Sequence, residues 1–248
     1  NDVFMNEDDY DELAFLVRTK KNVILQGAPG VGKTYCAKRL AYSLMGQKDS
    51  SRVMMVQFHQ SYSYEDFIEG YRPSGGGFEL RKGPFYRFCK KAEVDSDNEY
   101  FFIIDEINRG NLSKIFGELF MLIEADKRGV GLNLLYSDEE FSVPKNVRII
   151  GMMNTADRSL AMLDYALRRR FAFFDIRPGF GSDGFKAYLD DLDSDQFASL
   201  VSTVKQLNVE ISEDDTLGEG FCIGHSYFCG IPAGKADSAR LAAIVNYE

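Results

Sequence analysis

The distribution of apolar and polar residues along the chain predicts strands and helices in alternation. Compact apolar runs predict buried strands at 22–26, 53–56, 100–104, 147–153 and 171–176. Apolar residues recur at helical spacing at 10–19, 33–45, 113–125 and 159–170. Apolar runs without polar alternation are typical of a parallel sheet that is buried on both faces. The pattern therefore predicts a doubly wound α/β sheet.

The pattern changes towards the C-terminus. Pro178 and the glycine-rich segment 179–184 interrupt the alternation, and the residues that follow have mostly helical patterning with few strand signals. We predict a large α/β domain at 1–177 and a small, mostly helical domain at 178–248. Because the chain opens on Asn1 rather than Met and closes within a helical pattern, we expect a piece of a longer protein with an incomplete small domain.

Composition excludes several classes of protein. The 248 residues are 45% hydrophobic and 13% aromatic, which is enough apolar surface for a packed core and excludes a disordered chain. No apolar run approaches the roughly 20 residues that cross a bilayer, so we expect no membrane partner. A net charge of −9 argues against holding nucleic acid by bulk attraction. Four dispersed cysteines and two histidines predict free buried thiols and no zinc site, and without a signal peptide we expect a cytoplasmic protein.

Residues 27–34 satisfy the phosphate-loop pattern G-x-x-x-x-G-K-[ST], between a predicted strand and a predicted helix. The glycines let backbone N–H groups surround phosphate oxygens, and the helix N-terminus adds positive potential. We expect Lys33 to reach the β and γ phosphates and the Thr34 hydroxyl to ligate Mg²⁺. The predicted nucleotide-binding residues are Gly27, Ala28, Pro29, Gly30, Val31, Gly32, Lys33, Thr34 and Tyr35.

Polar side chains follow two of the other predicted strands. Asp105 and Glu106 end the run 100–104, at the carboxyl edge where open α/β sheets bind their ligands. Asp105 is the predicted Mg²⁺ carboxylate, and Glu106 is the predicted group that polarises the attacking water. Asn154 follows a third strand, and its amide can hydrogen-bond both phosphate and water. Asp157 either caps the following turn or orients the water.

Three adjacent arginines, Arg168, Arg169 and Arg170, end a predicted helix. Neighbouring residues of a helix point about 100° apart, so at most two of the three side chains face one target. One interpretation is an arginine finger that stabilises transition-state charge on the nucleotide of a neighbouring subunit. The other is a cationic helix C-terminus that satisfies the last carbonyls. The residues alone leave both open.

Together these motifs resemble the AAA+ superfamily of ring NTPases, and the resemblance covers nearly the whole chain. It narrows to the McrB family, the GTP-hydrolysing motor subunits of modification-dependent restriction systems. The segments that carry it are 153–159 (MNTADRS), 163–171, 101–111, 58–67 and 223–228 (IGHSYF). The first of these segments is the most specific.

The resemblance implies roles for several residues. Asn154 and Asp157 would position the water, Arg169 or Arg170 would serve the adjacent protomer, and Arg158 would contact phosphate across the same interface. It also implies Mg²⁺, GTP as substrate in preference to ATP, a hexameric ring and an McrC-like nuclease partner. DNA would be read by a separate N-terminal domain, and pore loops would add contacts to DNA or to the partner.

Two departures from the resemblance stand out. The sequence contains no N-K-x-D motif, by which many other GTPases read guanine, so the preference for GTP comes from the resemblance alone. The AAA+ lid usually supplies an arginine to the nucleotide, and Arg240 near a helix start is a weak candidate. His225 lies in a lid segment that could come near the nucleotide, although a buried, hydrogen-bonded histidine is the plainer interpretation.

Two hairpin patterns lie outside the predicted sheet. The segment 78–82 follows a glycine run, and 132–135 pairs with 141–143. Arg81 and Lys82 in the first hairpin either are solvated or face a ring pore, where DNA or the nuclease partner would meet them.

Two other functions compete with a GTP-driven restriction motor. An ATP-driven remodeller of the MoxR or dynein-related kind would share the phosphate loop and the Asp-Glu pair. A nucleotide-gated module would bind the nucleotide to assemble a ring and would turn over slowly.

Overall fold

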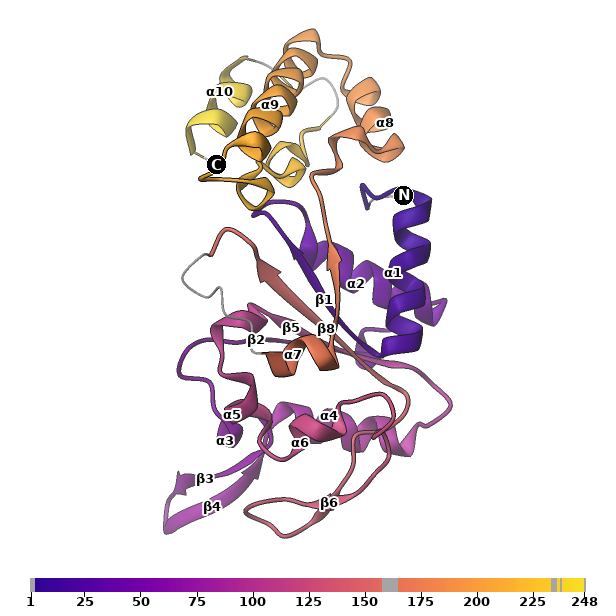
Figure 1. Cartoon of the computed structure of the whole chain (residues 1–248), viewed down its shortest axis with the longest axis vertical. Helices are drawn as coiled ribbons and strands as arrows, with labels where there is room; N and C mark the ends of the chain where they lie inside the picture. Colours follow the sequence, from indigo (N-terminus) through magenta and orange to yellow (C-terminus); the bar gives the residue numbers. More distant parts are fainter. Residues whose placement is uncertain (1–2, 158–164, 233–235, 237, 248) are drawn as a thin grey trace.

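The computed structural model describes residues 3–157, 165–232, 236 and 238–247. Its large domain is built on a parallel sheet of five strands in the order β2-β5-β8-β1-β9 (Figure 1). These strands are β1 (Asn22–Gly27), β2 (Val53–Gln57), β5 (Tyr100–Asp105), β8 (Val147–Asn154) and β9 (Ala172–Asp175). The predicted α/β class is confirmed, because each strand lies where an apolar run predicted it.

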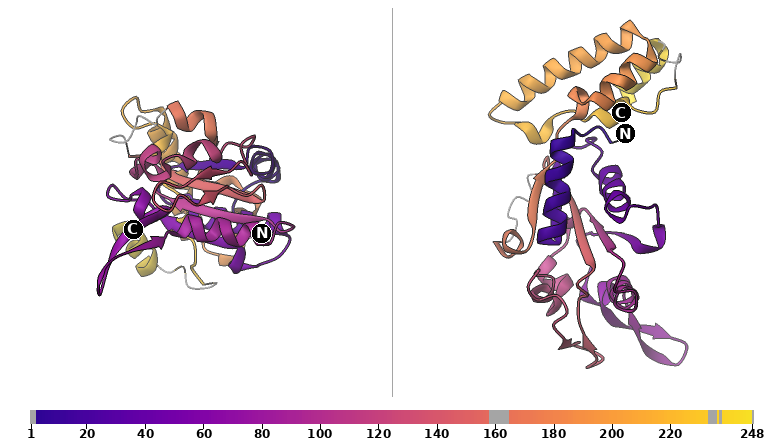
Figure 2. Two further views of the ribbon diagram at one scale, coloured as in Figure 1. Left: turned by 90° about the horizontal axis from the view of Figure 1, so that it is seen from below. Right: turned by 90° about the vertical axis from the view of Figure 1, so that its right-hand side faces the viewer.

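Helices cover both faces of the sheet (Figures 1 and 2). One face packs against α1 (Glu7–Lys20) and α2 (Lys33–Met45). The other packs against α3 (Tyr64–Phe67), α4 (Pro84–Val94), α5 (Leu112–Phe116), α6 (Leu119–Leu122) and α7 (Tyr165–Arg170). In β5 the side chains alternate between these two cores, since Phe101 contributes to the first and Phe102 to the second. This double burial explains why residues 101–104 of the strand are all apolar.

The helix predicted over 113–125 is wrong as a single element. It is broken into α5 and α6 at Gly117, whose backbone is left-handed at φ 52°. A Cβ on Gly117 would lie 2.9 Å from the Tyr64 ring, so only glycine fits this close approach. The predicted inward-facing side chains are confirmed, because Ile115, Phe116 and Leu119 are all buried. Of the helix predicted over 159–170, residues 165–170 are described and form α7.

Aromatic rings fill the core between the sheet and α3 to α6. Phe67 is fully buried, and its ring contacts those of Phe58, Phe85, Phe102 and Phe116 at centroid distances of 4.9 to 5.6 Å. The contacts are mostly edge-to-face, the arrangement that aromatic quadrupoles favour.

We expect Phe67→Ala to lower the free energy of unfolding by about 3–5 kcal/mol, because the cavity it leaves is lined by rigid rings. Urea denaturation followed by circular dichroism measures this loss. The matched control is Phe78→Ala, whose side chain is 74% exposed and whose loss should change stability by less than about 0.5 kcal/mol. Equal effects of the two substitutions would contradict the described core.

Two hairpins project from the end of the large domain that lies away from the small domain (Figure 1). They are formed by β3 (Glu69–Ser74) with β4 (Gly77–Lys82), and by β6 (Leu132–Asn133) with β7 (Glu140–Phe141). The second pairing confirms the predicted hairpin, with shorter strands. The described residues also form 3₁₀ turns at Ser50–Arg52 and Ile107–Arg109, and at Gly179–Gly181 directly after this domain.

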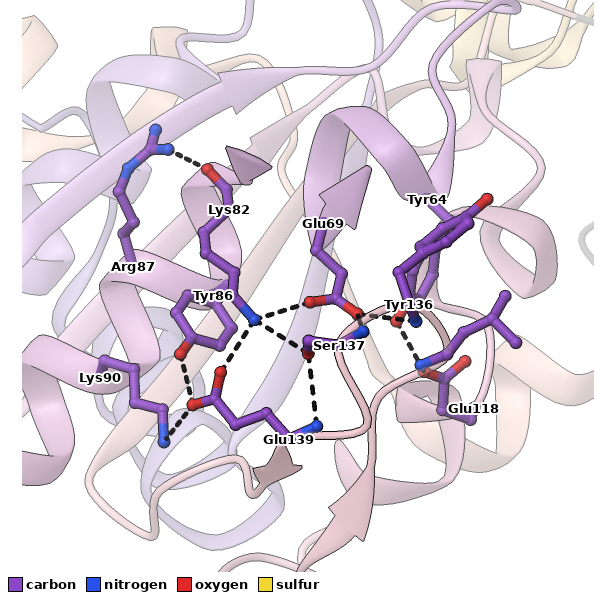
Figure 3. A network of polar contacts seen from close by, with 11 residues as sticks. Tyr64, Glu69, Lys82, Tyr86, Arg87, Lys90, Glu118, Tyr136, Ser137 and Glu139 are labelled. Atoms are coloured by element: carbon purple, nitrogen blue, oxygen red, sulfur yellow. Dashed lines mark hydrogen bonds and ion pairs between the residues drawn. The ribbon is translucent and has the colours of Figure 1, made fainter. Parts of the chain in front are cut away.

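A polar network joins the two hairpins (Figure 3). The carboxylate of Glu69 is fully buried and accepts hydrogen bonds from Lys82 Nζ at 2.7 Å and from the backbone N–H groups of Tyr136 and Ser137 at 2.9 Å. Lys82 also donates to Glu139 at 2.8 Å, and this contact holds the pKa of Glu139 down at about 2. Lys82 therefore links the two hairpins through its contacts with Glu69 and Glu139, while the neighbouring Arg81 is exposed.

The C-terminal part of the chain is helical, as predicted. It contains α8 (Asp183–Leu192), α9 (Asp195–Glu213), α10 (Ser238–Tyr247) and the 3₁₀ turns Glu219–Phe221 and His225–Phe228. Its own core includes Phe185, Phe197 and Val201. The N-terminus lies beside this domain (Figure 2). The Phe4 ring contacts the Phe185 ring at a centroid distance of 5.3 Å.

The predicted free thiols are confirmed. Cys36, Cys89 and Cys222 are buried and unpaired by disulfide, and Cys229 is half-buried. In the described part of the chain, no helix combines the length and the apolar character required to traverse a bilayer.

Candidate active site

The segment between β1 and α2 forms a glycine loop at the carboxyl edge of the sheet. Gly30 and Gly32 have left-handed backbones at φ 74° and 77°, which let the loop turn tightly before α2 begins. Lys33 is the first residue of α2, and its buried ammonium donates to the carbonyls of Gly27 at 2.9 Å and Ala28 at 2.8 Å. The side chain of Thr34 stands next to it at the exposed helix N-terminus.

Burial lowers the pKa of Lys33 to about 8. Desolvation of the ammonium is the main cause, and the nearby carboxylates of Glu106 and Asp105 oppose it. Asp105 has a raised pKa because of its own desolvation and the neighbouring charge of Glu106. The lysine and the acidic pair thus act on one another electrostatically, as expected of groups that share one phosphate and metal site.

Strand register places the third predicted group beside the loop. Gly27 pairs with Asn154 of β8, and the Thr155 N–H donates to the Gly27 carbonyl at 3.1 Å. A Cβ on Gly27 would lie 2.3 Å from the carbonyl oxygen of Ile176, so the loop begins tightly packed between β8 and the end of β9. The predicted convergence of three strand ends is therefore present in the fold.

Glu106 and Asn154 are in direct contact. Asn154 Nδ2 donates to Glu106 Oε1 at 2.9 Å. Glu106 has a left-handed backbone at φ 50°, an unusual conformation for a residue with a side chain, and it turns the carboxylate out of the strand direction. This local strain at the strand end is characteristic of functional positions.

Sequence reasoning missed Arg109, which links two of the predicted residues. Its Nε donates to Glu106 Oε2 at 3.0 Å, and its Nη2 donates to Asp157 Oδ2 at 3.0 Å. The guanidinium is the second partner of the Glu106 carboxylate, beside Asn154. The signal available in the sequence was the spacing of three between Glu106 and Arg109, which a 3₁₀ turn brings onto one side.

The predicted metal residues are Thr34 and Asp105. Among the described residues no group of three His, Cys, Asp or Glu side chains forms a metal cluster. The Thr34 hydroxyl and the Asp105 carboxylate fit Mg²⁺ bound to a nucleotide, because Mg²⁺ is usually held by one or two protein oxygens together with phosphates and water.

The arginines at the end of α7 differ in their surroundings. Arg170 pairs with Glu124 at 2.9 Å, donates from Nε to the Phe120 carbonyl at 2.8 Å and stacks over the Phe120 ring. Arg169 has a side chain that is 74% exposed and lies 3.8 Å from Glu124. Asn22 anchors this end of the helix by donating from Nδ2 to the Arg170 carbonyl at 2.9 Å. Arg158 lies outside the described residues.

The small domain packs against the glycine loop. The Ser226 N–H donates to the Gly30 carbonyl at 2.8 Å, and the Tyr227 ring lies so close to Gly30 that a Cβ there would be 2.2 Å from it. Gly224 packs directly on the backbone of Gly30, since a Cβ on Gly224 would lie 1.9 Å from the Gly30 carbonyl carbon. Beside these contacts, a cavity of about 350 Å³ is lined by Ala28 and by residues of α9. The segment 223–228 therefore contacts the glycine loop.

Two family models match the chain. The AAA domain of the dynein-related subfamily matches residues 22–171, and the McrB alpha-helical lid domain matches residues 199–248. The chain belongs to the AAA domain family and carries an McrB-type lid. The predicted resemblance to the McrB family is thereby confirmed, and the small domain is hereafter called the lid.

Two curated relatives belong to restriction systems. The McrB-type chain is 56% identical over 237 residues to the type IV methyl-directed restriction enzyme EcoKMcrB subunit of Escherichia coli K12, which covers 92% of this chain and 52% of that protein. It is 29% identical over 194 residues to the type II restriction enzyme BsuMI component YdiS of Bacillus subtilis 168, covering 62% of this chain and 56% of that protein. The chain thus spans about half the length of these relatives.

Proposed function

We propose that this McrB-type AAA domain hydrolyses GTP in preference to ATP, with Mg²⁺, as the motor of a DNA restriction complex. The observation that carries the proposal is the meeting of Lys33, the Asp105–Glu106 pair and Asn154 at one sheet edge. The AAA family supports hydrolysis of a nucleoside triphosphate. The preference for GTP rests on the similarity to the McrB subunit.

Each group has a role in phosphoryl transfer. The loop N–H groups from Gly27 to Thr34 and the Lys33 ammonium would hold the phosphates, together with the neighbouring Tyr35. Thr34 and Asp105 would hold Mg²⁺, which supplies charge neutralisation on the β and γ phosphates. Glu106 would orient and polarise the attacking water, with Asn154 fixing the carboxylate and Asp157 acting through Arg109.

A direct comparison of nucleotides tests the proposal. The purified chain is titrated with GTP and with ATP in the presence of Mg²⁺, and affinity, hydrolysis and molecular mass are followed together. We expect tighter binding and faster hydrolysis of GTP, and a rise in mass towards a ring. Folded protein that binds neither nucleotide would refute the function, while equal use of both would favour the ATP-driven remodeller.

We further propose a homo-oligomeric, hexameric ring in which Arg169 reaches the nucleotide of the next subunit. We assign this role to Arg169 because its side chain is exposed, whereas Arg170 is held by Glu124 and Phe120. An McrC-like nuclease would bind the ring, and DNA would be read by a domain outside this chain. Arg81 on the exposed hairpin is the candidate contact for DNA or for the nuclease.

Mixing two inactive variants tests the arginine. Arg169→Ala and Lys33→Ala should each lose hydrolysis when alone. In an equimolar mixture about a quarter of the interfaces pair an intact Lys33 with a neighbour's intact Arg169. Hydrolysis should therefore recover to about a quarter of the rate of the parent chain. Arg168→Ala, also exposed, is the control and should stay active by itself. No recovery in the mixture would place the arginine's action within one chain.

A slow, nucleotide-gated assembly module is the second candidate. The contacts of Glu106 with Arg109 and Asn154 favour it, because a carboxylate held by two donors is restrained from approaching water. Hydrolysis that stays below one turnover per minute even with a nuclease partner present would select this function.

A further inference from the structure

We propose that His225 of the lid binds a phosphate oxygen of the nucleotide through its Nε2–H. This rests on the proposed nucleotide site and adds a binding residue to it from the lid. The imidazole belongs to the turn His225–Phe228 and is 6% exposed, where it is surrounded by the rings of Phe4, Phe180 and Phe185.

One nitrogen of the ring has a fixed role. His225 Nδ1 accepts a hydrogen bond from the Gly179 N–H at 2.8 Å. A ring nitrogen that accepts carries no proton, so in a neutral imidazole the proton must be on Nε2. Burial supports the neutral form, because it lowers the pKa of His225 to about 4. Nε2 is therefore an N–H donor.

That donor faces the glycine loop. A Cβ built on Gly32 would lie 3.6 Å from Nε2, which brings the N–H close to the loop residue just before Lys33. Within the described ranges, no protein acceptor bonds Nε2. Phosphate oxygens held by the loop N–H groups would lie on this side of the ring, and they provide the missing acceptor.

The lid segment is seated firmly enough to hold the ring there. Ser226 donates to Gly30, and both Gly224 and Tyr227 pack on the same residue. Arg240, the arginine that the sequence suggested for this role, lies instead on α10 and interacts with Tyr188. His225 thus occupies the place from which the lid reaches the phosphates.

The same ring joins the nucleotide to the domain linker. Gly179 begins the turn that connects β9 to α8, and it bonds the opposite nitrogen. A phosphate on Nε2 and the linker N–H on Nδ1 polarise one ring from both sides. Binding of the nucleotide is in this way coupled to the position where the lid leaves the large domain.

Two conservative substitutions separate the roles of the two nitrogens. In His225→Asn the side-chain oxygen can replace Nδ1, but the distal donor is lost. In His225→Gln the amide NH₂ can replace Nε2–H. We expect His225→Asn to weaken GTP binding about tenfold, as for a hydrogen bond to a charged group, and His225→Gln to stay within about threefold of the parent chain. The exposed His59→Asn is the control and should have no effect.

The opposite order, or equal affinities in all variants, would overturn the proposal, because the ring would then serve only the lid packing. A parent chain that binds no nucleotide would instead refute the proposed function, so the two failures are distinguishable.

Imidazole NMR gives a readout that does not depend on variants at His225. The chain has two histidines, so His59→Gln protein labelled with ¹⁵N-histidine shows a single ring. Addition of a non-hydrolysable GTP analogue with Mg²⁺ should move the Nε2–H proton downfield and slow its exchange with water. An unchanged signal at saturating nucleotide would contradict the contact.

Discussion

Lys33→Ala is expected to weaken binding of a nucleoside triphosphate by about a hundredfold or more. In the proposed site the ammonium is the loop's point charge for the phosphates, and hydrogen bonds to charged groups contribute about 1.5–3 kcal/mol each. Isothermal titration calorimetry with GTP and Mg²⁺ measures the loss. Lys38→Ala, an exposed lysine on the same helix, is the control and should bind as the parent does.

The same substitution should leave the fold intact. The folded pKa of Lys33 is about 8, below the ordinary value of 10.5, so at pH 7 the folded state holds this charge less favourably than the unfolded chain does. Removing the ammonium relieves this desolvation penalty but leaves the Gly27 and Ala28 carbonyls without their donor, so the two effects oppose one another and the melting temperature should change little. Retained affinity in folded Lys33→Ala would refute the role of Lys33 in binding phosphate.

Glu106→Gln is expected to keep nucleotide binding and to lower hydrolysis by about a hundredfold to ten-thousandfold, the range for loss of a general base. Glutamine has the same shape and can still accept from Asn154, but it polarises water weakly and loses the ion pair with Arg109. Single-turnover hydrolysis under saturating GTP isolates this step from product release.

Two comparisons sharpen the result. Glu210→Gln removes the same charge from an exposed glutamate on α9 that is not one of the predicted site residues, and this variant should hydrolyse normally. Asn154→Ala should lower turnover more than affinity. If Glu106→Gln turned over at nearly the parent rate, Glu106 would not act on the water, and Asp157 would become the alternative carboxylate.

The parts of the site that sequence could predict are those set by local patterns. The phosphate loop, the acidic pair and Asn154 each follow an apolar run, and parallel strands necessarily bring their carboxyl ends to one edge. Gly117 was not read as a helix break because its reason lies in the Tyr64 ring, over fifty residues earlier. A periodic pattern does not report such a distant neighbour.

Contacts between distant segments account for the other omissions. Arg109 reaches Asp157 across 48 positions, and Gly179 reaches His225 across 46. No local pattern indicates that the carboxylate of Glu69 is buried, because its partners at 136 and 137 belong to another hairpin. Polar groups of this kind become interpretable only when their acceptors and donors are known.

In the proposed ring, the anchoring of Arg170 would affect how readily neighbouring subunits associate. Its guanidinium is held by Glu124, and its carbonyl is held by Asn22, the first residue of strand β1. The backbone that carries Arg169 is therefore ordered before any neighbour arrives, and only the rotamers of one side chain remain to be restricted on contact. Docking would then lose little conformational entropy at this point, which favours fast and repeated engagement as each nucleotide is exchanged.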